Sequence, residues 1–236
     1  MVRAVLLAAG YGTRLLPYTE ILEKALLPIG SKPAIKWVTD SMGEQGIDVF
    51  VICSLSKFRP QFEHEYRDAN SKVLFHSVEQ PLGTAGHVRQ CFRDGLIRSD
   101  EPFILYYADD LTKVDYHDLL KVHASSGYDA TVVVTDNIRH DYSKVYMSDK
   151  EKGKVTGFEE KPYIGHNAWA GIAVVEPHVV GDLGDYDTDF GHNVWPRLAQ
   201  QGRLGAYYNA HAWLDIGNTR AYYYANKLAK EGKLLT

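Results

Sequence analysis

The residues of this chain best suited to chemistry are glycines and cations that follow a short N-terminal apolar run. Residues 2–9 are mostly apolar, and residues 10–14 (Gly-Tyr-Gly-Thr-Arg) come directly after them. Glycines allow positive φ and close backbone approach, so successive N–H groups can turn toward one bound anion. Arg14 and Lys24 then supply positive charge for phosphate oxygens. The stretch fits a phosphate-binding loop and also a plain tight turn, and the glycines alone leave both interpretations open.

Two familiar phosphate loops do not match this stretch. The loop of the P-loop nucleotidases ends in Gly-Lys-Ser/Thr, which is absent here, and the dinucleotide fingerprint needs a third glycine that this chain lacks. A different nucleotide-binding architecture is therefore indicated.

A pair of carboxylates, Asp109 and Asp110, follows a second apolar run at residues 102–107. Carboxylate oxygens suit Mg²⁺, which takes one or two protein carboxylates and keeps several waters. Aspartates are also common in turns and helix caps, so the dipeptide alone leaves that alternative open. The pair is therefore a candidate metal site at the carboxyl end of a strand, and the residues alone do not decide between the two interpretations.

The order of several motifs resembles that of the sugar-1-phosphate nucleotidylyltransferases, also called nucleotide-sugar pyrophosphorylases. Gly-x-Gly-Thr-Arg-Leu stands at 10–15, Lys-Ala-Leu-Leu-Pro at 24–28 and Pro-Leu-Gly-Thr-Ala-Gly at 81–86. The resemblance implies that Arg14 meets the outer phosphates of a nucleoside triphosphate and Lys24 the phosphate where bonds change. It also implies a set of nucleotide-binding residues: Leu7, Ala8, Ala9, Gly10, Gly12, Thr13, Gln80, Pro81, Gly83 and Thr84.

The same resemblance implies which residues bind the metal ion. The family has Gly-Asp-x-Leu where this chain has residues 108–111, with Ala108 in place of the glycine, and Trp-x-Asp-x-Gly where it has residues 213–217. It implies that Asp109 and Asp215 hold Mg²⁺. A turn aspartate satisfied by backbone N–H groups is the alternative for Asp215.

Residues further along resemble the family's acceptor site. Phe-x-Glu-Lys-Pro at 158–162 implies that a glutamate binds sugar hydroxyls and that a lysine binds the sugar phosphate and assists catalysis, although a Glu-Lys pair is also typical of a solvated surface. Ser143 and Trp169 depart from the usual Gly and Asn. The sugar-phosphate residues that we expect are Asp109, Glu160, Lys161, Trp169 and Gly171.

The elements that must position these residues alternate along the chain. Strands are predicted at 2–9, 48–53, 72–76, 102–107, 128–135 and 168–176, with amphipathic helices between most of them. Right-handed βαβ crossovers give a doubly wound, mostly parallel Rossmann-like sheet with helices on both faces, which binds ligands beyond the carboxyl ends of its strands. Segments 144–147 and 154–158 predict a small antiparallel β insertion at the sugar side, covering the ligand edge.

Length and charge limit the number of domains and the kinds of partner that this chain could have. We expect one domain over residues 1–236, with a nucleotide-binding part at about 1–135, a sugar-phosphate part at about 136–219 and a C-terminal helix at about 220–231. The net charge is −4 and no long basic run occurs, which argues against nucleic-acid and membrane partners. No apolar stretch approaches a membrane span. We therefore expect a cytoplasmic protein, and leave open whether it forms a homo-oligomer.

These observations predict an enzyme of nucleotide-sugar biosynthesis. The sugar phosphate oxygen would attack the α-phosphorus of a nucleoside triphosphate and pyrophosphate would leave, so that positioning and charge neutralisation do the work. None of the ten histidines is needed as a base, because a phosphate monoester is already an anion. UTP or dTTP with glucose 1-phosphate is favoured. The alternatives are a mannose-1-phosphate guanylyltransferase, a phosphocholine-type cytidylyltransferase with Trp169 as aromatic wall, and a non-catalytic nucleotide-sugar-binding regulator.

Overall fold

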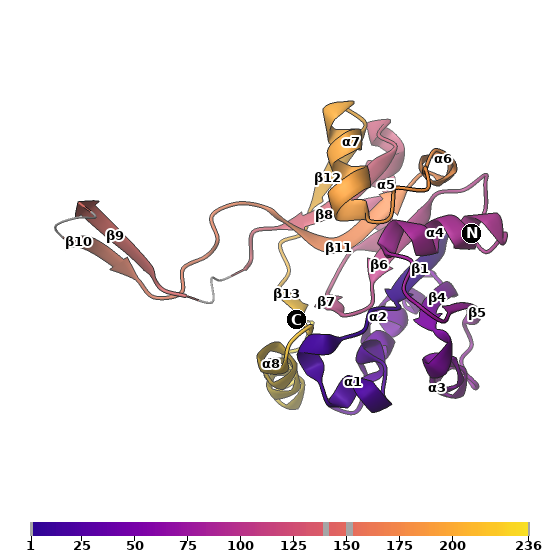
Figure 1. Ribbon diagram of the computed structural model, residues 1–236, viewed down its shortest axis with the longest axis horizontal. Helices are drawn as coiled ribbons and strands as arrows, with labels where there is room; N and C mark the ends of the chain where they lie inside the picture. Colours follow the sequence, from indigo (N-terminus) through magenta and orange to yellow (C-terminus); the bar gives the residue numbers. More distant parts are fainter. Residues whose placement is uncertain (1, 139–141, 150–152, 236) are drawn as a thin grey trace.

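A seven-stranded sheet forms the centre of the chain in the computed structural model, which describes residues 2–138, 142–149 and 153–235 (Figure 1). Its neighbouring strands are all parallel except for the pairs that β11 makes with β6 and β8. The predicted mostly parallel sheet is therefore confirmed. From edge to edge the strands are β12 (Leu204–Tyr208), β8 (Ala130–Thr135), β11 (Ala168–Val175), β6 (Phe103–Tyr107), β1 (Arg3–Ala8), β4 (Val49–Leu55) and β5 (Lys72–Val78).

Helices cover both faces of this sheet, as the sequence predicted. Side chains alternate along a strand, so in β1 Ala4 and Leu6 join one buried core while Val5 joins the other. The first core packs against α2 (Ala34–Gly43), α3 (Arg59–Glu65) and α5 (Tyr116–Ser126). The second packs against α4 (Thr84–Arg93), α6 (Pro177–Gly181) and α7 (Trp195–Gln200). The remaining helical segments are α1 (Tyr18–Ile21), α8 (Thr219–Lys230), the 3₁₀ turns η1 (Thr13–Leu15), η2 (Lys24–Leu26) and η3 (Ser56–Phe58), and the π-helical η4 (Phe190–Val194).

Two helical regions differ in how well local sequence patterns predict them. Asp115 caps α5 by accepting from the N–H of Asp118, and Gly127 ends that helix in the left-handed conformation, roles that are typical of these residue types. The amphipathic pattern of residues 190–201 predicts one helix, but the structure has η4 followed by α7. Pro196 has no N–H to donate to the preceding turn, which accounts for the wider π turn before it.

Three two-stranded sheets complete the fold. In the first, β7 (Asp110–Thr112) and β13 (Trp213–Asp215) pair antiparallel. The second consists of β2 (Pro28–Ile29) and β3 (Lys32–Pro33). The third is the predicted hairpin of β9 (Lys144–Asp149) and β10 (Lys154–Glu159), which projects from the body of the molecule in Figure 1. The turn predicted at 148–153 lies partly outside the described residues.

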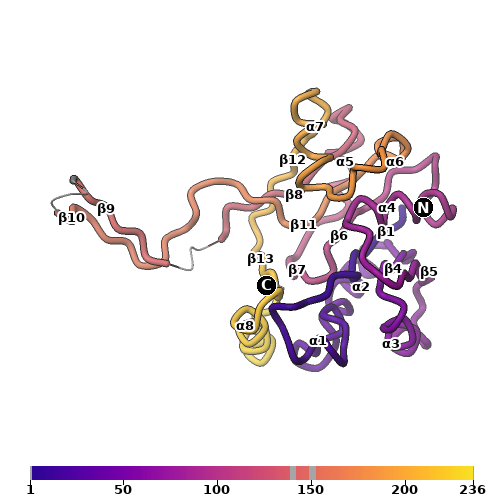
Figure 2. The backbone as a smooth tube through the Cα atoms, viewed as in Figure 1, coloured from indigo at the N-terminus to yellow at the C-terminus, as the bar shows by residue number. Residues whose placement is uncertain are grey.

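The C-terminal helix closes the structure onto the N-terminal segment. Asn218 caps α8 by accepting from the N–H of Ala221. The Tyr222 hydroxyl donates to the Pro28 carbonyl at 3.0 Å, and Asn226 accepts from a backbone N–H at 3.0 Å, so α8 lies beside the segment that follows β1 (Figure 2). None of the helices in the described ranges is long and apolar enough to span a membrane.

Gly83, at the start of α4, provides a test of how tightly this fold constrains the backbone of the glycine-rich motif at 81–86. Its φ of +77° and ψ of 163° are essentially restricted to glycine, and an added Cβ would lie 2.2 Å from the Thr188 carbonyl oxygen. We predict that Gly83→Ala lowers the free energy of unfolding by at least ~2 kcal/mol. The matched variant Gly127→Ala also has positive φ but meets no atom within 4 Å, and should cost about 1 kcal/mol. Equal losses in urea denaturation would contradict this account.

Candidate active site

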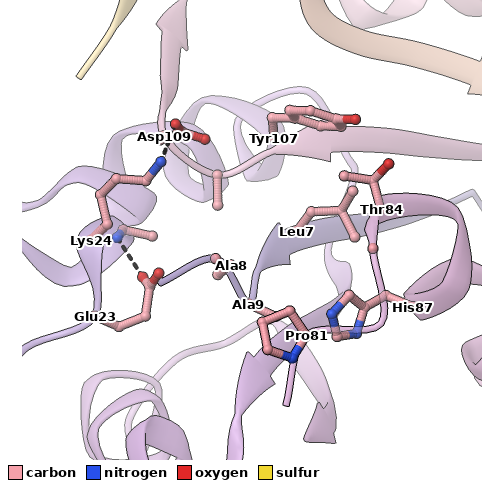
Figure 3. A pocket seen from close by; sticks show the side chains of 14 residues that line it. Leu7, Ala8, Ala9, Glu23, Lys24, Pro81, Thr84, His87, Tyr107 and Asp109 are labelled. Carbon is pink, nitrogen blue, oxygen red and sulfur yellow. Dashed lines mark hydrogen bonds and ion pairs between the residues drawn. The ribbon is translucent and has the colours of Figure 1, made fainter. Parts of the chain in front are cut away.

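The main cavity lies at the carboxyl ends of β1 and β6, where the strand order of the sheet reverses. From β1 the sheet continues through β4 on one side and β6 on the other, and ligands of doubly wound folds bind at such a point. The cavity measures about 230 Å³, less than the ~300–1,000 Å³ of a full ligand pocket, so it suits one part of a larger ligand. Its lining residues are Leu7, Ala8, Ala9, Gly10, Glu23, Lys24, Ala25, Pro81, Gly83, Thr84, His87, Tyr107, Ala108 and Asp109 (Figure 3).

Most of the residues expected at the nucleotide are part of this lining. Residues 7–10, at the end of β1 and directly after it, line the cavity together with Pro81, Gly83 and Thr84. Gly12 and Thr13 follow on η1, outside the lining, and Gln80 is exposed beside Pro81. The structure therefore brings the two glycine-rich segments together, although they lie some seventy residues apart in the sequence.

Lys24 and Asp109 form an ion pair at the mouth of the cavity (Figure 3). Their side chains are only 16% and 17% exposed, so water screens the pair weakly. Lys24 begins η2, whose first turn is capped by the carboxyl group of Glu23 accepting from the N–H of Ala25. Both sequence-predicted residues are thus held by short structured turns at adjacent strand ends.

Asp215 joins this group through the pairing of β13 with β7. The N–H of Ile216 donates to the Asp109 carbonyl at 3.0 Å, and that of Gly217 to Asp215 Oδ1 at 2.6 Å. Burial raises the pKa of Asp215, and the neighbouring Asp109 carboxylate raises it further. A Cβ added at Gly217 would fall 2.6 Å from Asp215 Oδ1 and 2.8 Å from Arg14 Nη2, so the Arg14 guanidinium lies beside this carboxylate.

The donor set fits a magnesium ion whose remaining ligands come from substrate and water. Asp109 and Asp215 are neighbouring carboxylates whose mutual repulsion a divalent cation would relieve. Among the described residues no group of three or more His, Cys, Asp or Glu side chains is arranged to hold a metal ion. Mg²⁺ commonly takes only one or two protein carboxylates with substrate phosphates, so two are sufficient.

Asp110, the second aspartate of the pair, is buried. It is 5% exposed, and burial, with Asp109 and Asp215 nearby, raises its pKa well above the usual range. A Cβ on Gly171 would lie 1.8 Å from Asp110 Oδ2, and Gly171 has a φ of +72°. In this structure the glycine expected beside the sugar ring therefore makes room for a carboxyl group. Nothing in the sequence indicated this contact, because the glycine and the two aspartates belong to separate motifs.

The structure does not bring the expected acceptor residues to the cavity. Glu160 and Lys161 follow β10 on the projecting hairpin, where Glu160 accepts a hydrogen bond from the Ser143 hydroxyl. Lys161 has a positive φ of 44°, which is uncommon for a residue other than glycine.

Trp169 is packed among other aromatic side chains. Its ring meets those of Tyr107 and Trp195 edge-on, with centroids 5.0 and 5.7 Å away. Its Nε1 donates to the Ile172 carbonyl at 2.9 Å. These contacts already satisfy the indole N–H and occupy part of the ring, so its role here is at least partly structural.

Glu23 is the lining residue whose chemistry sequence analysis missed most completely. It is 1% exposed, and burial raises its pKa to about 8. A charged residue directly before Lys24 was the available signal, but only the tertiary structure decides that the side chain points inward. Near neutral pH this group is largely protonated.

The raised pKa of Glu23 predicts how stability depends on pH. Between its ordinary pKa of 4.5 and about 8, the folded state binds more protons than the unfolded state, so stability falls as pH rises through this window. Glu23→Gln keeps the oxygen that accepts from Ala25 but does not ionise. We predict that wild type loses roughly 1–4 kcal/mol more than this variant between pH 5 and 8.5, measured by urea denaturation. The exposed control Glu79→Gln should follow wild type, and parallel curves for Glu23→Gln and wild type would refute the prediction.

Comparisons with known proteins agree with this geometry. The model of the nucleotidyl transferase family matches residues 3–232. The rice protein "Probable mannose-1-phosphate guanylyltransferase 2" (Oryza sativa subsp. japonica) is 31% identical over 228 residues, covering 93% of this chain and 62% of the relative. The chain thus spans less than two thirds of the length of such relatives.

Solved structures share the fold at lower identity. UDP-glucose pyrophosphorylase from Acinetobacter baumanii has a TM-score of 0.73 and 20% identity, over 100% of this chain and 96% of that one. HddC from Yersinia pseudotuberculosis, complexed with GMP-PN, has a TM-score of 0.71 and 22% identity, over 96% and 99%. The sequence match over nearly the whole chain decides the assignment: this protein belongs to the nucleotidyl transferase family, which confirms its resemblance to the sugar-1-phosphate nucleotidylyltransferases.

Proposed function

We propose that this protein is an enzyme that joins a nucleoside triphosphate to a sugar 1-phosphate, giving a nucleotide sugar and pyrophosphate. The observation that carries the proposal is the cluster of Arg14, Lys24, Asp109 and Asp215 at the mouth of a cavity built from two glycine-rich segments. A regulator that only binds nucleotide sugar would have no need of this charge arrangement. Residues 1–135 would hold the nucleotide, and residues 136–219 would hold most of the sugar phosphate.

The chemistry in this proposal is positioning and charge neutralisation. The sugar phosphate oxygen attacks the α-phosphorus in line, the bond to the β-phosphate oxygen breaks, and pyrophosphate leaves with that electron pair. In this proposal Lys24, on its capped turn, would neutralise charge at the reacting phosphate, and Arg14 would do so at the outer phosphates. Asp109 and Asp215 would hold Mg²⁺, which supplies positive charge to phosphate oxygens when bound. No protein base is required, because the attacking oxygen is already anionic.

Two substrate pairs compete within this function. UTP or dTTP with glucose 1-phosphate is the pair that the sequence favours, and a UDP-glucose pyrophosphorylase shares the fold. GTP with mannose 1-phosphate is the second candidate, because the sequence relatives carry the name of mannose-1-phosphate guanylyltransferase. Phosphocholine with CTP is less well supported, since Tyr107 and Trp195 already contact the Trp169 ring.

Pyrophosphate release tests the reaction and the substrate pair together. GTP, UTP, dTTP and CTP are each combined with glucose 1-phosphate, mannose 1-phosphate and phosphocholine, with and without Mg²⁺. We expect Mg²⁺-dependent release with a sugar phosphate. A higher kcat/KM for GTP with mannose 1-phosphate would establish the second candidate over the first. No release with any pair would refute the function.

Aspartate variants supply the mechanistic control. Asp109→Asn and Asp215→Asn keep the side-chain size and remove one carboxylate each, so turnover should fall by at least ~10²-fold. Asp100→Asn, whose carboxylate pairs with Arg98 on the exposed surface, should retain wild-type turnover. Wild-type rates for both site variants at limiting Mg²⁺ would remove the metal assignment while leaving the fold untouched.

The acceptor role of Glu160 and Lys161 is part of this proposal, and it requires that the hairpin move toward the cavity. We predict that Lys161→Ala raises the KM for every sugar phosphate at least ~10-fold, because it removes a phosphate cation. Glu160→Gln should change the ranking among glucose, mannose and galactose 1-phosphates. Glu159→Gln is the matched control, since Glu159 accepts from Tyr146 on the same hairpin. Unchanged constants for both site variants would mean that the acceptor binds elsewhere.

A further inference from the structure

His87 is a buried imidazole in the cavity wall that the proposed mechanism does not use. It lies on α4, is 3% exposed, and its ring stands beside Pro81 in Figure 3. Its Nε2 is 3.3 Å from the backbone nitrogen of Leu82. Because an amide N–H can only donate, Nε2 must accept, which places the ring proton on Nδ1. Burial and the neighbouring His76 lower the pKa of His87 to about 4, so the ring is neutral at ordinary pH.

The segment that His87 contacts has little apolar anchoring. Glu79 and Gln80 are exposed, Leu82 is 40% exposed, and Pro81 is only half-buried. Side chains that would otherwise fix a loop to the core are therefore turned to solvent here. The hydrogen bond from the Leu82 amide to His87 is thus a substantial restraint on this part of the cavity wall.

A second buried histidine, His76, lies beside His87. His76, on β5, is 6% exposed, and its ring faces that of His87 edge-on with centroids 5.5 Å apart. Its Nδ1 points toward the Asp94 carboxylate, 3.9 Å away, which favours a proton on Nδ1 and leaves a lone pair on Nε2. Within the described residues, Nε2 of His76 and Nδ1 of His87 are buried without hydrogen-bond partners. The facing rings therefore carry one unused acceptor and one unused donor.

We propose that His87 is a positioning residue that holds residues 79–83 in the shape that receives the nucleobase. The inference rests on the proposed function, in which residues 1–135 hold the nucleotide and this segment belongs to the nucleotide-binding part. Pro81 and Gly83 line the cavity on either side of Leu82. Releasing the Leu82 amide would let Pro81 shift, lowering nucleotide affinity without moving the cations that act on the phosphates.

The test compares two substitutions of one side chain. His87→Leu fills similar space but cannot accept a hydrogen bond, whereas the carboxamide oxygen of His87→Gln can reach the position of Nε2. We expect His87→Leu to raise the KM for the nucleoside triphosphate at least ~10-fold, while kcat and the KM for the sugar phosphate stay within ~3-fold of wild type. His87→Gln should restore the nucleotide KM to within ~3-fold. An unchanged KM in His87→Leu, or equal impairment in the two variants, would overturn the proposal.

A matched control separates positioning from general stability. His123 is also 3% exposed and makes hydrogen bonds to Thr131 and Glu176, but it lies on α5, outside the cavity lining. His123→Leu should lower the melting temperature and leave the nucleotide KM unchanged. If His87→Leu does not fold, His87→Met takes its place with the same expected rise in the nucleotide KM, and no rise would count against the proposal.

Direct binding distinguishes failure of this inference from failure of the proposed function. Calorimetric titrations with GTP, UTP and dTTP give affinities that do not depend on turnover. If wild type binds one of them but releases no pyrophosphate, the proposed function fails, and the affinities of the His87 variants then decide the inference. If wild type binds none of the three, both fail.

Discussion

The gathering of carboxylates at one edge of the sheet is the constraint on which the rest of this structure depends. Asp109, Asp110 and Asp215 lie close together, and burial raises the pKa of Asp110 and of Asp215, which the neighbouring Asp109 carboxylate raises further. Such a group is costly unless cations offset it. Lys24 pairs directly with Asp109 and Arg14 lies beside Asp215, so the segment after β1 supplies the compensation. A ligand that carries phosphates and a divalent cation would enter a site already balanced for charge.

The framework holds this balance by joining distant parts of the chain. The pairing of β7 with β13 sets Asp215 opposite Asp110. Helix α8 begins immediately after β13 and is hydrogen-bonded to the segment that carries Lys24, through Tyr222 and Asn226. The carboxylates and their counter-charges are therefore connected through one continuous piece of structure. This connection accounts for the position of a helix that lines no part of the cavity.

The cavity and the hairpin differ in how they are built. The cavity has walls of strand ends and capped turns packed on two buried cores. The hairpin is a two-stranded element, and such elements are at best marginally stable without a partner. Its apolar side chains Val145, Met147, Val155 and Phe158 are 46–63% exposed. The cavity is thus supported by buried cores, while the hairpin exposes apolar surface.

The sequence by itself determined the fold class and most of the cavity wall. Apolar runs, helix caps and glycine-rich turns are local signals, and β1, β4, β5 and β6 lie close to their predicted places. The motifs also identified Lys24, Asp109 and Asp215, which the structure brings together at the predicted strand ends.

Only the tertiary structure decided which side chains are buried and what they meet. Glu23 and His87 became part of the wall because η2 and α4 pack at the switch point, and Gly171 faces Asp110 because β11 pairs with β6, which Asp110 follows. The π turn before Pro196 and the direction of the hairpin were likewise not predictable. The physical reason is that burial and pKa depend on contacts between residues far apart in the chain, whereas sequence patterns record mainly neighbours within a few turns.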